Sequence, residues 1–244
     1  MSGCVARLNR ASEMKERSVP VRLVCFDVDG TLIDHPEGKT VWQLLNDAIL
    51  GDSSVSARRF DAFKAGRITY SDWVALDLLD WKSLGVARSD LVEIIESQLY
   101  LNEGVKETFD ELDRRSVPVA IVSGTIDLTL RIHCGDLTYD REFSNRIHFD
   151  DAGRITGWEA TPYDVGGKAA AIDLLAGEYG LSRASCAFVG DGWNDIPAMA
   201  AAGRSVAFRP KLNEVREAAD AVIEDGPLTE LFELFDIEGG LANG

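Results

Sequence analysis

The stretch VRLVCFDVDGTLID, residues 21–34, decides how this chain folds. An almost unbroken apolar run ends abruptly in two carboxylates, Asp27 and Asp29, and a Gly-Thr pair suited to a tight turn follows them. In an extended chain, residues two apart point the same way, so both carboxylates can reach one point just past the end of a buried strand. Open α/β sheets bind ligands at that end of their strands. The stretch therefore predicts a strand that leads into a site.

Two carboxylates that converge on one point repel each other unless a shared proton or a cation relieves them. A hard cation with oxygen ligands is suited to this, and Mg²⁺ is the cation we expect. The alternative is a solvated hairpin corner, because Asp and Gly are common turn residues. The rest of the chain decides between the two.

Immediately after this stretch the pattern becomes helical. From about residue 40 to residue 101 we predict four helices, over residues 41–50, 55–64, 70–82 and 88–99, and no strand. Ser54 or Ser56, Thr69 and Ser89 stand where N-caps are expected. An all-helical block inserted here predicts a small cap over residues 37–102.

Three tryptophans of this predicted cap, Trp42, Trp73 and Trp81, are expected to pack its interior. The alternative is that one of them lines a substrate pocket. We expect the connectors 33–39 and 100–104, which carry Gly38 and Gly104, to let the cap open and close.

From residue 104 onward, strands and helices alternate, which implies parallel βαβ units and a sheet covered on both faces. This predicts an α/β fold with a Rossmann-like, doubly wound parallel core. The core is expected to contain residues 20–36 and 103–237, with a loose leader over residues 1–19 before it and a flexible tail over residues 238–244 after it. Expected strands cover residues 117–122, 143–149, 154–159, 186–189, 205–208 and 221–223, with the second and third forming a hairpin. Expected helices cover residues 105–114, 127–133, 169–179, 196–202, 213–219 and 228–235.

Composition excludes several classes of function. A formal net charge of −16 argues against binding to a nucleic-acid backbone, which requires clustered Lys and Arg. No apolar run approaches the roughly 20 residues of a membrane span, and no signal-peptide core opens the chain. We therefore expect a cytoplasmic protein, a monomer or homodimer, without membrane or nucleic-acid partners. The four cysteines lack C-x-x-C spacing and are expected to be small core residues: Cys4, Cys25, Cys134 and Cys186.

Three strand ends and one helix start carry unusual polar chemistry, and in a parallel sheet these ends lie along one edge. The set is what phosphoryl transfer requires. One carboxylate attacks phosphorus, and a second protonates the leaving oxygen and later activates water. Hydroxyl, backbone N–H and lysine groups hold the anionic oxygens, and Mg²⁺ joins nucleophile and phosphate. The polar groups are Asp27 and Asp29, the run Ser123-Gly124-Thr125, Lys168, and Asp191 with Asn194 and Asp195.

The segments FDVDGT, VSGT, GK at a helix start and VGDGWNDIPAM resemble, in this order, the four motifs of the haloacid dehalogenase superfamily. The helical insert after the first motif, together with the tail around residues 207–220, looks most like the phosphoserine-phosphatase branch. The resemblance implies a Mg²⁺-dependent phosphatase that forms an aspartyl-phosphate intermediate and acts on a small-molecule phosphate ester.

Roles follow residue by residue from the resemblance. It implies that Asp27 is the nucleophile, that Asp29 is the general acid/base, and that Lys168 neutralises charge on the nucleophile and phosphoryl group. The implied phosphate- and substrate-binding residues are Thr31, Ser123, Gly124 and Asn194, and the implied metal residues are Asp27, Asp29 through its backbone carbonyl, Asp191 and Asp195.

The substrate is less well defined. Phosphoserine enzymes place a glutamate after the first motif and an arginine within the cap. Here Glu37 is the glutamate after the first motif, one residue late, and the helix expected over 70–82 contains no arginine, which leaves Arg67 or Lys64 as the cation. Phosphoserine is the first candidate, and a neutral alcohol or sugar phosphate the alternative if neither cation reaches the pocket.

Rival functions stay open at this stage. A dehalogenase of the same superfamily does not need Asp29 to protonate a leaving alkoxide. A receiver-type signalling module also carries a phosphorylated aspartate and a lysine, but needs neither Asp29 nor a cap. A degenerate phosphate-binding regulatory protein is the third alternative.

Overall fold

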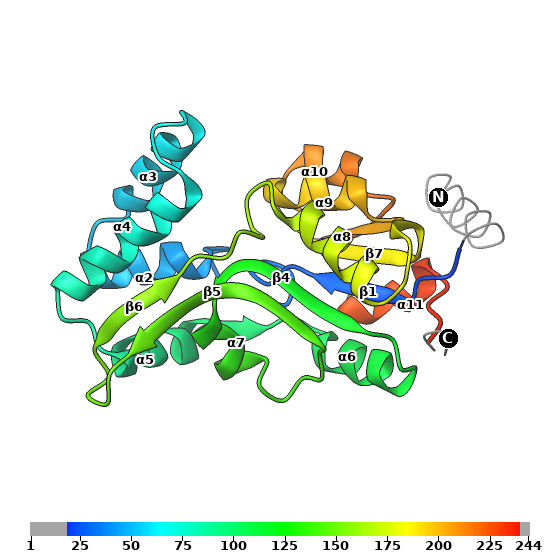
Figure 1. The fold of residues 1–244 in the computed structure, drawn as a ribbon, viewed down its shortest axis with the longest axis horizontal. Helices are drawn as coiled ribbons and strands as arrows, with labels where there is room; N and C mark the ends of the chain where they lie inside the picture. The colour runs from blue at the N-terminus through cyan, green and yellow to red at the C-terminus, as the bar shows by residue number, and fades with distance from the viewer. Residues whose placement is uncertain (1–18, 240–244) are drawn as a thin grey trace.

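The structure is a computed structural model that describes residues 19–239. Most of the predicted leader and the last five residues of the predicted tail lie outside the described residues. A seven-stranded sheet runs through the molecule in the order β6-β5-β4-β1-β7-β8-β9, with β1 at its centre (Figure 1). The strands are β1 Leu23–Phe26, β4 Val119–Ile126, β5 Arg141–Phe149, β6 Ile155–Glu159, β7 Cys186–Gly190, β8 Arg204–Phe208 and β9 Ala221–Ile223.

The first strand is buried on both faces, as its apolar run predicts. It pairs in parallel with β4 on one side and β7 on the other. Its alternate side chains Leu23 and Cys25 pack in one core cluster, and Val24 and Phe26 pack in another. The predicted α/β fold with a mostly parallel sheet is confirmed, and so is the antiparallel hairpin of β5 and β6 at the sheet edge.

Helices cover both faces of this sheet, which explains the two core clusters. α8, α9 and α10 lie on one face of the sheet and α6 lies on the other (Figure 1). α8, α9 and α10 pack against Leu23 and Cys25, and Phe109 of α6 lies 5.1 Å from Phe26 between ring centroids. The helices of this part are α6 Val105–Arg114, α7 Asp127–His133, α8 Lys168–Glu178, α9 Ile196–Ala201, α10 Asn213–Ala218 and α11 Leu231–Leu234, with short 3₁₀ turns η1 Arg183–Ser185, η2 Trp193–Asp195 and η3 Leu228–Glu230.

The block between β1 and α6 contains the four predicted helices, with boundaries within one residue of those expected. They are α2 Val41–Leu50, α3 Ser54–Lys64, α4 Tyr70–Ser83 and α5 Arg88–Gln98. The first three lie beyond the sheet at one end of the molecule, whereas α5 packs beside α7 of the core (Figure 1). The block is therefore joined to the core along α5, and the predicted cap boundaries stay a prediction.

The prediction of no strand from about residue 40 to residue 101 was wrong at its far end, where β3 Tyr100–Leu101 forms, and β2 Ile33–Asp34 lies just before that range. The two strands pair antiparallel where the chain enters and leaves the block. Two-residue strands are too short to show a periodic pattern, so the sequence carries no signal for them. The pairing ties the two connectors together.

Helix starts were predicted with mixed success. Thr69 caps α4 as expected and forms a capping box with Asp72. Ser54 is the first residue of α3 and Ser56 lies inside that helix, and neither makes a side-chain cap. The next helix, α5, begins after Ala87, whose backbone N–H donates to Asp90 Oδ2 at 2.9 Å. An acidic side chain in the first turn can satisfy an N-terminal donor as well as a serine can, which explains the error at Ser89.

The strand predicted to end at residue 122 continues to Ile126, so Ser123, Gly124 and Thr125 lie within β4. The register against β5 shifts between Val122 and Ile126, and this irregularity bends the strand at the site. No helix within residues 19–239 has the length and apolar character needed to cross a membrane.

Candidate active site

Lys168 joins three segments that lie far apart in the sequence. It is the first residue of α8, and its Nζ lies 2.6 Å from Asp27 Oδ1 at the end of β1 and 2.6 Å from Asp195 Oδ1 in the turn after β7. Lys168 and Asp195 are fully buried and Asp27 nearly so. Burial alone would lower the pKa of Lys168, but Asp195 and Asp27 raise it, so the lysine is charged.

Asp191 completes the cluster of carboxylates. One oxygen from each of Asp27, Asp191 and Asp195 lies within 4.8 Å of the others. The backbone N–H groups of Asp191 and Gly192 donate to Asp195 Oδ2 at 3.0 and 2.9 Å, which fixes that side chain. Burial, Asp195 and Asp27 raise the pKa of Asp191, and the opposing effect of Lys211 and Lys168 does not offset them. An all-oxygen set with excess negative charge fits a hard divalent cation.

The tight turn after β1 requires a glycine. Gly30 has a φ of 88°, and a Cβ at this position would lie 2.2 Å from Asp191 Oδ2. The absence of a side chain therefore lets Asp191 approach the turn that follows Asp27. Thr31 is buried beside it, with Oγ1 3.5 Å from Asp191 Oδ1.

The side chain of Asp29 contacts the helical block. Its Oδ1 accepts the backbone N–H of Val41, the first residue of α2, at 2.8 Å. Burial, opposed by this hydrogen bond, raises the pKa of Asp29 to about 7. A carboxyl group with such a pKa can both give and take a proton near neutral pH.

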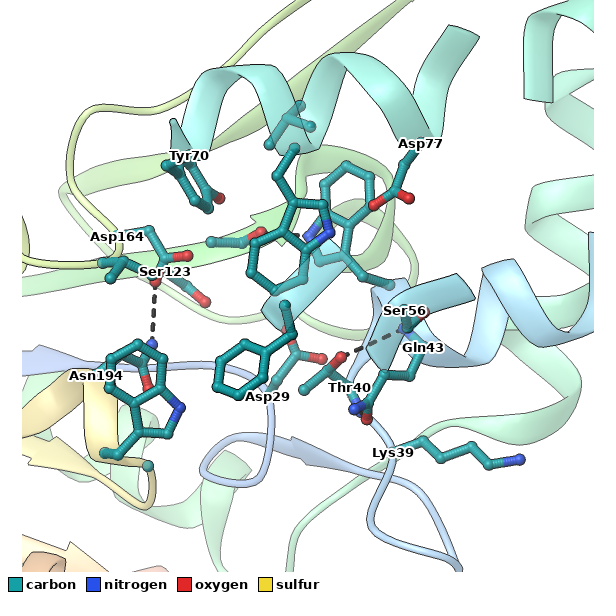
Figure 2. A pocket seen from close by; sticks show the side chains of 18 of the residues that line it. Asp29, Lys39, Thr40, Gln43, Ser56, Tyr70, Asp77, Ser123, Asp164 and Asn194 are labelled. Atoms are coloured by element: carbon teal, nitrogen blue, oxygen red, sulfur yellow. Dashed lines mark hydrogen bonds between the residues drawn. The ribbon is translucent and has the colours of Figure 1, made fainter. Parts of the chain in front are cut away.

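Ser123 and Gly124 face the cluster from β4. Ser123 is buried, and its Oγ accepts the Thr125 N–H at 3.2 Å. A Cβ on Gly124 would lie 2.0 Å from Asp164 Oδ2, so only glycine fits beside that carboxylate. Asn194 donates from Nδ2 to Asp164 Oδ1 at 3.0 Å (Figure 2).

The helical block touches this edge of the sheet directly. Trp42 Nε1 of α2 donates to the Gly124 carbonyl at 2.7 Å, and Asn145 Nδ2 donates to the Tyr70 hydroxyl of α4 at 2.7 Å. Tyr70 also shares a hydrogen bond with Asp164. These contacts hold α2 and α4 over the carboxylates.

A cavity of about 570 Å³ lies between the block and the sheet edge. Tyr70, Asp164 and Asn194 lie on one side of it, and Lys39, Gln43 and Asp77 on the other (Figure 2). Five of its lining residues are aromatic: Trp42, Phe60, Tyr70, Trp73 and Trp193. The carboxylates Asp27, Asp29 and Asp191 also line this cavity, so it leads to the cluster.

A family model for haloacid dehalogenase-like hydrolases matches residues 21–203. The chain belongs to this family. That membership confirms the resemblance and excludes the receiver-type module.

Similar proteins place this hydrolase in the phosphoserine phosphatase-like branch. A phosphoserine phosphatase of Wolinella succinogenes is 31% identical over 218 residues, 86% of this chain and 98% of its own length. One from Methanocaldococcus jannaschii is 28% identical over 87% of this chain and 96% of its own length. Two further relatives are phosphoserine phosphatases of Mycobacterium tuberculosis and Archaeoglobus fulgidus, and the match covers only 51% and 58% of their own lengths.

A solved structure described as a phospho-aspartyl intermediate analogue of phosphoserine phosphatase superposes on this hydrolase with a TM-score of 0.70. The two share 25% sequence identity, and the match covers 89% of this chain and all of the other. The similarity therefore extends over the core and the helical block together.

Two predicted substrate residues of the hydrolase lie outside the cavity lining. Glu37 is exposed, and its carboxylate pairs with Lys39 Nζ at 2.9 Å. Arg67 is exposed as well. Lys64 lies 4.6 Å from the centroid of the Trp193 ring and also does not line the cavity.

Several lining residues of the hydrolase were not expected from sequence. Tyr70 and Asp164 are the main ones, and no spacing rule points to either. Lys39 is the basic lining residue, where Arg67 or Lys64 was expected. Of the three tryptophans, Trp81 packs the interior as predicted, while Trp42 and Trp73 line the cavity.

Proposed function

We propose that this hydrolase is a Mg²⁺-dependent phosphomonoesterase that acts on a small phosphate ester through an aspartyl-phosphate at Asp27. The observation that carries the proposal is the buried contact of Lys168 with both Asp27 and Asp195, next to Asp191. The lysine neutralises one carboxylate of a cluster that still fits a divalent cation. The names of the similar proteins support the same reaction class.

In the first half of the reaction, an Asp27 carboxylate oxygen attacks phosphorus and the bond from phosphorus to the ester oxygen breaks. Asp29 gives its proton to the departing oxygen, so the product leaves as a neutral alcohol. Lys168 and the donors around Ser123, Gly124 and Asn194 stabilise the phosphoryl oxygens. Asp27, Asp191, Asp195 and the backbone carbonyl of Asp29 would hold a bound Mg²⁺, which would supply positive charge to the phosphoryl oxygens.

In the second half, water attacks the same phosphorus atom and gives a proton to Asp29. The acyl-phosphate bond breaks on the phosphorus side, which releases inorganic phosphate and restores the Asp27 carboxylate. Asp29 thus ends protonated, as it began. The helices α2 and α4 act as a cap that keeps other water away from the cavity while the intermediate exists.

The experiment is turnover of p-nitrophenyl phosphate with and without Mg²⁺. EDTA should abolish turnover and Mg²⁺ should restore it. Asp27→Asn should remove activity, since an amide does not attack phosphorus, whereas Asp110→Asn, an exposed carboxylate that pairs with Lys106, should leave it unchanged. Turnover by repurified Asp27→Asn, or full turnover in EDTA, would refute the proposal.

The degenerate phosphate-binding protein is the alternative that this experiment also decides, because it binds phosphate without turnover. Location in the cytoplasm and a monomeric or homodimeric state stay predictions.

A further inference from the structure

The wall of the cavity beyond the carboxylates is aromatic. Phe60 of α3 lies 6.0 Å from Trp73 of α4 and 5.8 Å from Trp193 of the core, between ring centroids. Trp42 is fixed over the Gly124 end by its indole hydrogen bond and by stacking on Trp81 at 5.5 Å. The part of a substrate that leaves as the alcohol would therefore meet ring faces from both the helical block and the core.

The charged groups of this wall already have partners. Lys39 Nζ lies 2.9 Å from Glu37 and 3.2 Å from Asp47. Arg59 pairs with Asp77 and Asp80. Among the described residues that line this part of the cavity, no cation is left to receive a substrate carboxylate.

The carboxylates Asp47 and Asp77 of this wall each contact one of these cations. Asp47 pairs with Lys39, and Asp77 pairs with Arg59 and accepts from Asn46 Nδ2 at 2.9 Å. One oxygen of Asp77, Oδ2, has no hydrogen-bond partner, so an amine-bearing ester is included in the test below. Lys39 and Arg59 are each shared between two carboxylates, so the wall has no free positive charge for a substrate carboxylate, and burial of an unpaired charge is unfavourable.

The size of the cavity also matters. A volume of about 570 Å³ lies in the range that holds drug-sized ligands. A serine side chain with its amine and carboxylate would fill a small part of it and leave ring faces exposed to water. A larger apolar group would bury them.

We propose that the physiological substrate is a phosphate ester of a neutral alcohol with a large apolar, ring-containing group, and not an amino-acid phosphate. This rests on the phosphomonoesterase function proposed above. It assigns Phe60, Trp73 and Trp193 as the residues that select the alcohol.

The test compares kcat/KM for four esters of unactivated primary alcohols: 2-phenylethyl phosphate, O-phosphoserine, phosphoethanolamine and glycerol phosphate. Because the leaving oxygens are of one chemical type, rate differences report how the rest of the alcohol is bound. The 2-phenylethyl ester should exceed each of the others by about tenfold or more, the scale on which an apolar pocket discriminates. An equal or higher value for any other ester would overturn the proposal.

Variants test whether the rings cause the preference. Trp73→Leu should remove most of the advantage of 2-phenylethyl phosphate and change kcat/KM for glycerol phosphate far less. The matched control is Trp158→Leu in β6, a partly buried tryptophan outside the cavity lining, which should keep the wild-type ranking. Circular dichroism of both variants checks that they fold. An unchanged ranking in folded Trp73→Leu would contradict the assignment.

Binding without turnover separates the two proposals. Tryptophan fluorescence of Asp27→Asn is titrated with 2-phenylethylphosphonate and with 2-amino-4-phosphonobutanoate, a phosphonate that keeps the amino-acid group. The first should bind about tenfold more tightly or better. Tighter binding of the amino-acid analogue overturns this inference even if turnover is high, whereas the expected binding order without any turnover refutes only the phosphatase function.

Discussion

Lys168 is the residue whose loss should be most costly, because its ammonium group is the buried counter-charge of Asp27 and Asp195. In Lys168→Met, two buried carboxylates lose their partner, and we expect the free energy of unfolding to fall by about 3–5 kcal/mol at neutral pH without added metal. Urea denaturation followed by circular dichroism measures this. Lys106→Met is the control: it removes an exposed ion pair with Asp110 and should change the free energy of unfolding by less than about 0.5 kcal/mol. Equal stability of the two variants would show that the buried pair is not formed.

The buried cysteines should be inert at ordinary pH. Burial raises the pKa of Cys186 to about 11 and that of Cys134 to about 12, and it raises the pKa of Cys25 still further. The reactive thiolate form is therefore scarce below pH 10, whereas a free cysteine is largely thiolate by pH 9.

In a Cys4→Ser background, which removes the cysteine outside the described residues, labelling with dithionitrobenzoate should stay slow from pH 7 to 9 and become immediate in urea. Fast labelling of folded protein at pH 8 would contradict the buried positions.

At the residue scale, the sequence predicts the residues that lie at or near the carboxyl ends of the parallel strands and misses Asp164 and Tyr70, which lie elsewhere. Asp27, Ser123 and Asp191 could be brought together because parallel strands end along one edge. Asp164 lies in the loop before α8, and Tyr70 begins a helix in the block, so no periodicity relates them to the site. Glu37 and Arg67 were expected from the family pattern, but local pairing and exposure hold them outside the cavity lining.

At the scale of elements, Gly104 is needed where β3 turns into α6. Its φ is 81°, and a Cβ would lie 2.8 Å from the backbone nitrogen of Leu228. Gly104→Ala should therefore lower the free energy of unfolding by more than about 1 kcal/mol.

Gly177 is the matched control, since it lies within α8 with no atom within 4 Å of an added Cβ. Gly177→Ala should raise stability by about 0.5–1 kcal/mol through helix propensity. Both changes are measured by chemical denaturation. An unchanged free energy of unfolding for Gly104→Ala would mean that the backbone of the connector can move to accept the added methyl group without cost.

Long periodic helices were predictable to within one residue in this chain, as α2 and α4 show. The two-residue strands β2 and β3 were not. β2 and β3 form only because the two connectors lie side by side in the folded protein. Local sequence patterns do not predict this pairing. The extension of β4 to Ile126 likewise depends on its neighbour β5.

At the scale of the whole molecule, the helical block should open for substrate and close over it. Limited proteolysis should cut the connectors near Gly38 and Gly104 faster in the free protein than with Mg²⁺ and beryllium fluoride. Trp42→Phe combined with Tyr70→Phe keeps an aromatic ring at both positions but removes the hydrogen bonds to Gly124 and Asn145, so cutting of the free protein should accelerate several-fold. Equal cutting with and without the phosphate mimic would indicate a fixed cap.

The central claim is covalent catalysis by Asp27, and the most direct measurement is to trap the intermediate. The enzyme is mixed with Mg²⁺ and 2-phenylethyl phosphate, quenched in acid and reduced with borohydride, which converts an aspartyl-phosphate to homoserine. Mass spectrometry of the peptide that contains residues 21–34 should then show homoserine at position 27 in wild type and none in Asp27→Asn. Homoserine at a different aspartate, with position 27 unmodified during active turnover, would contradict the account.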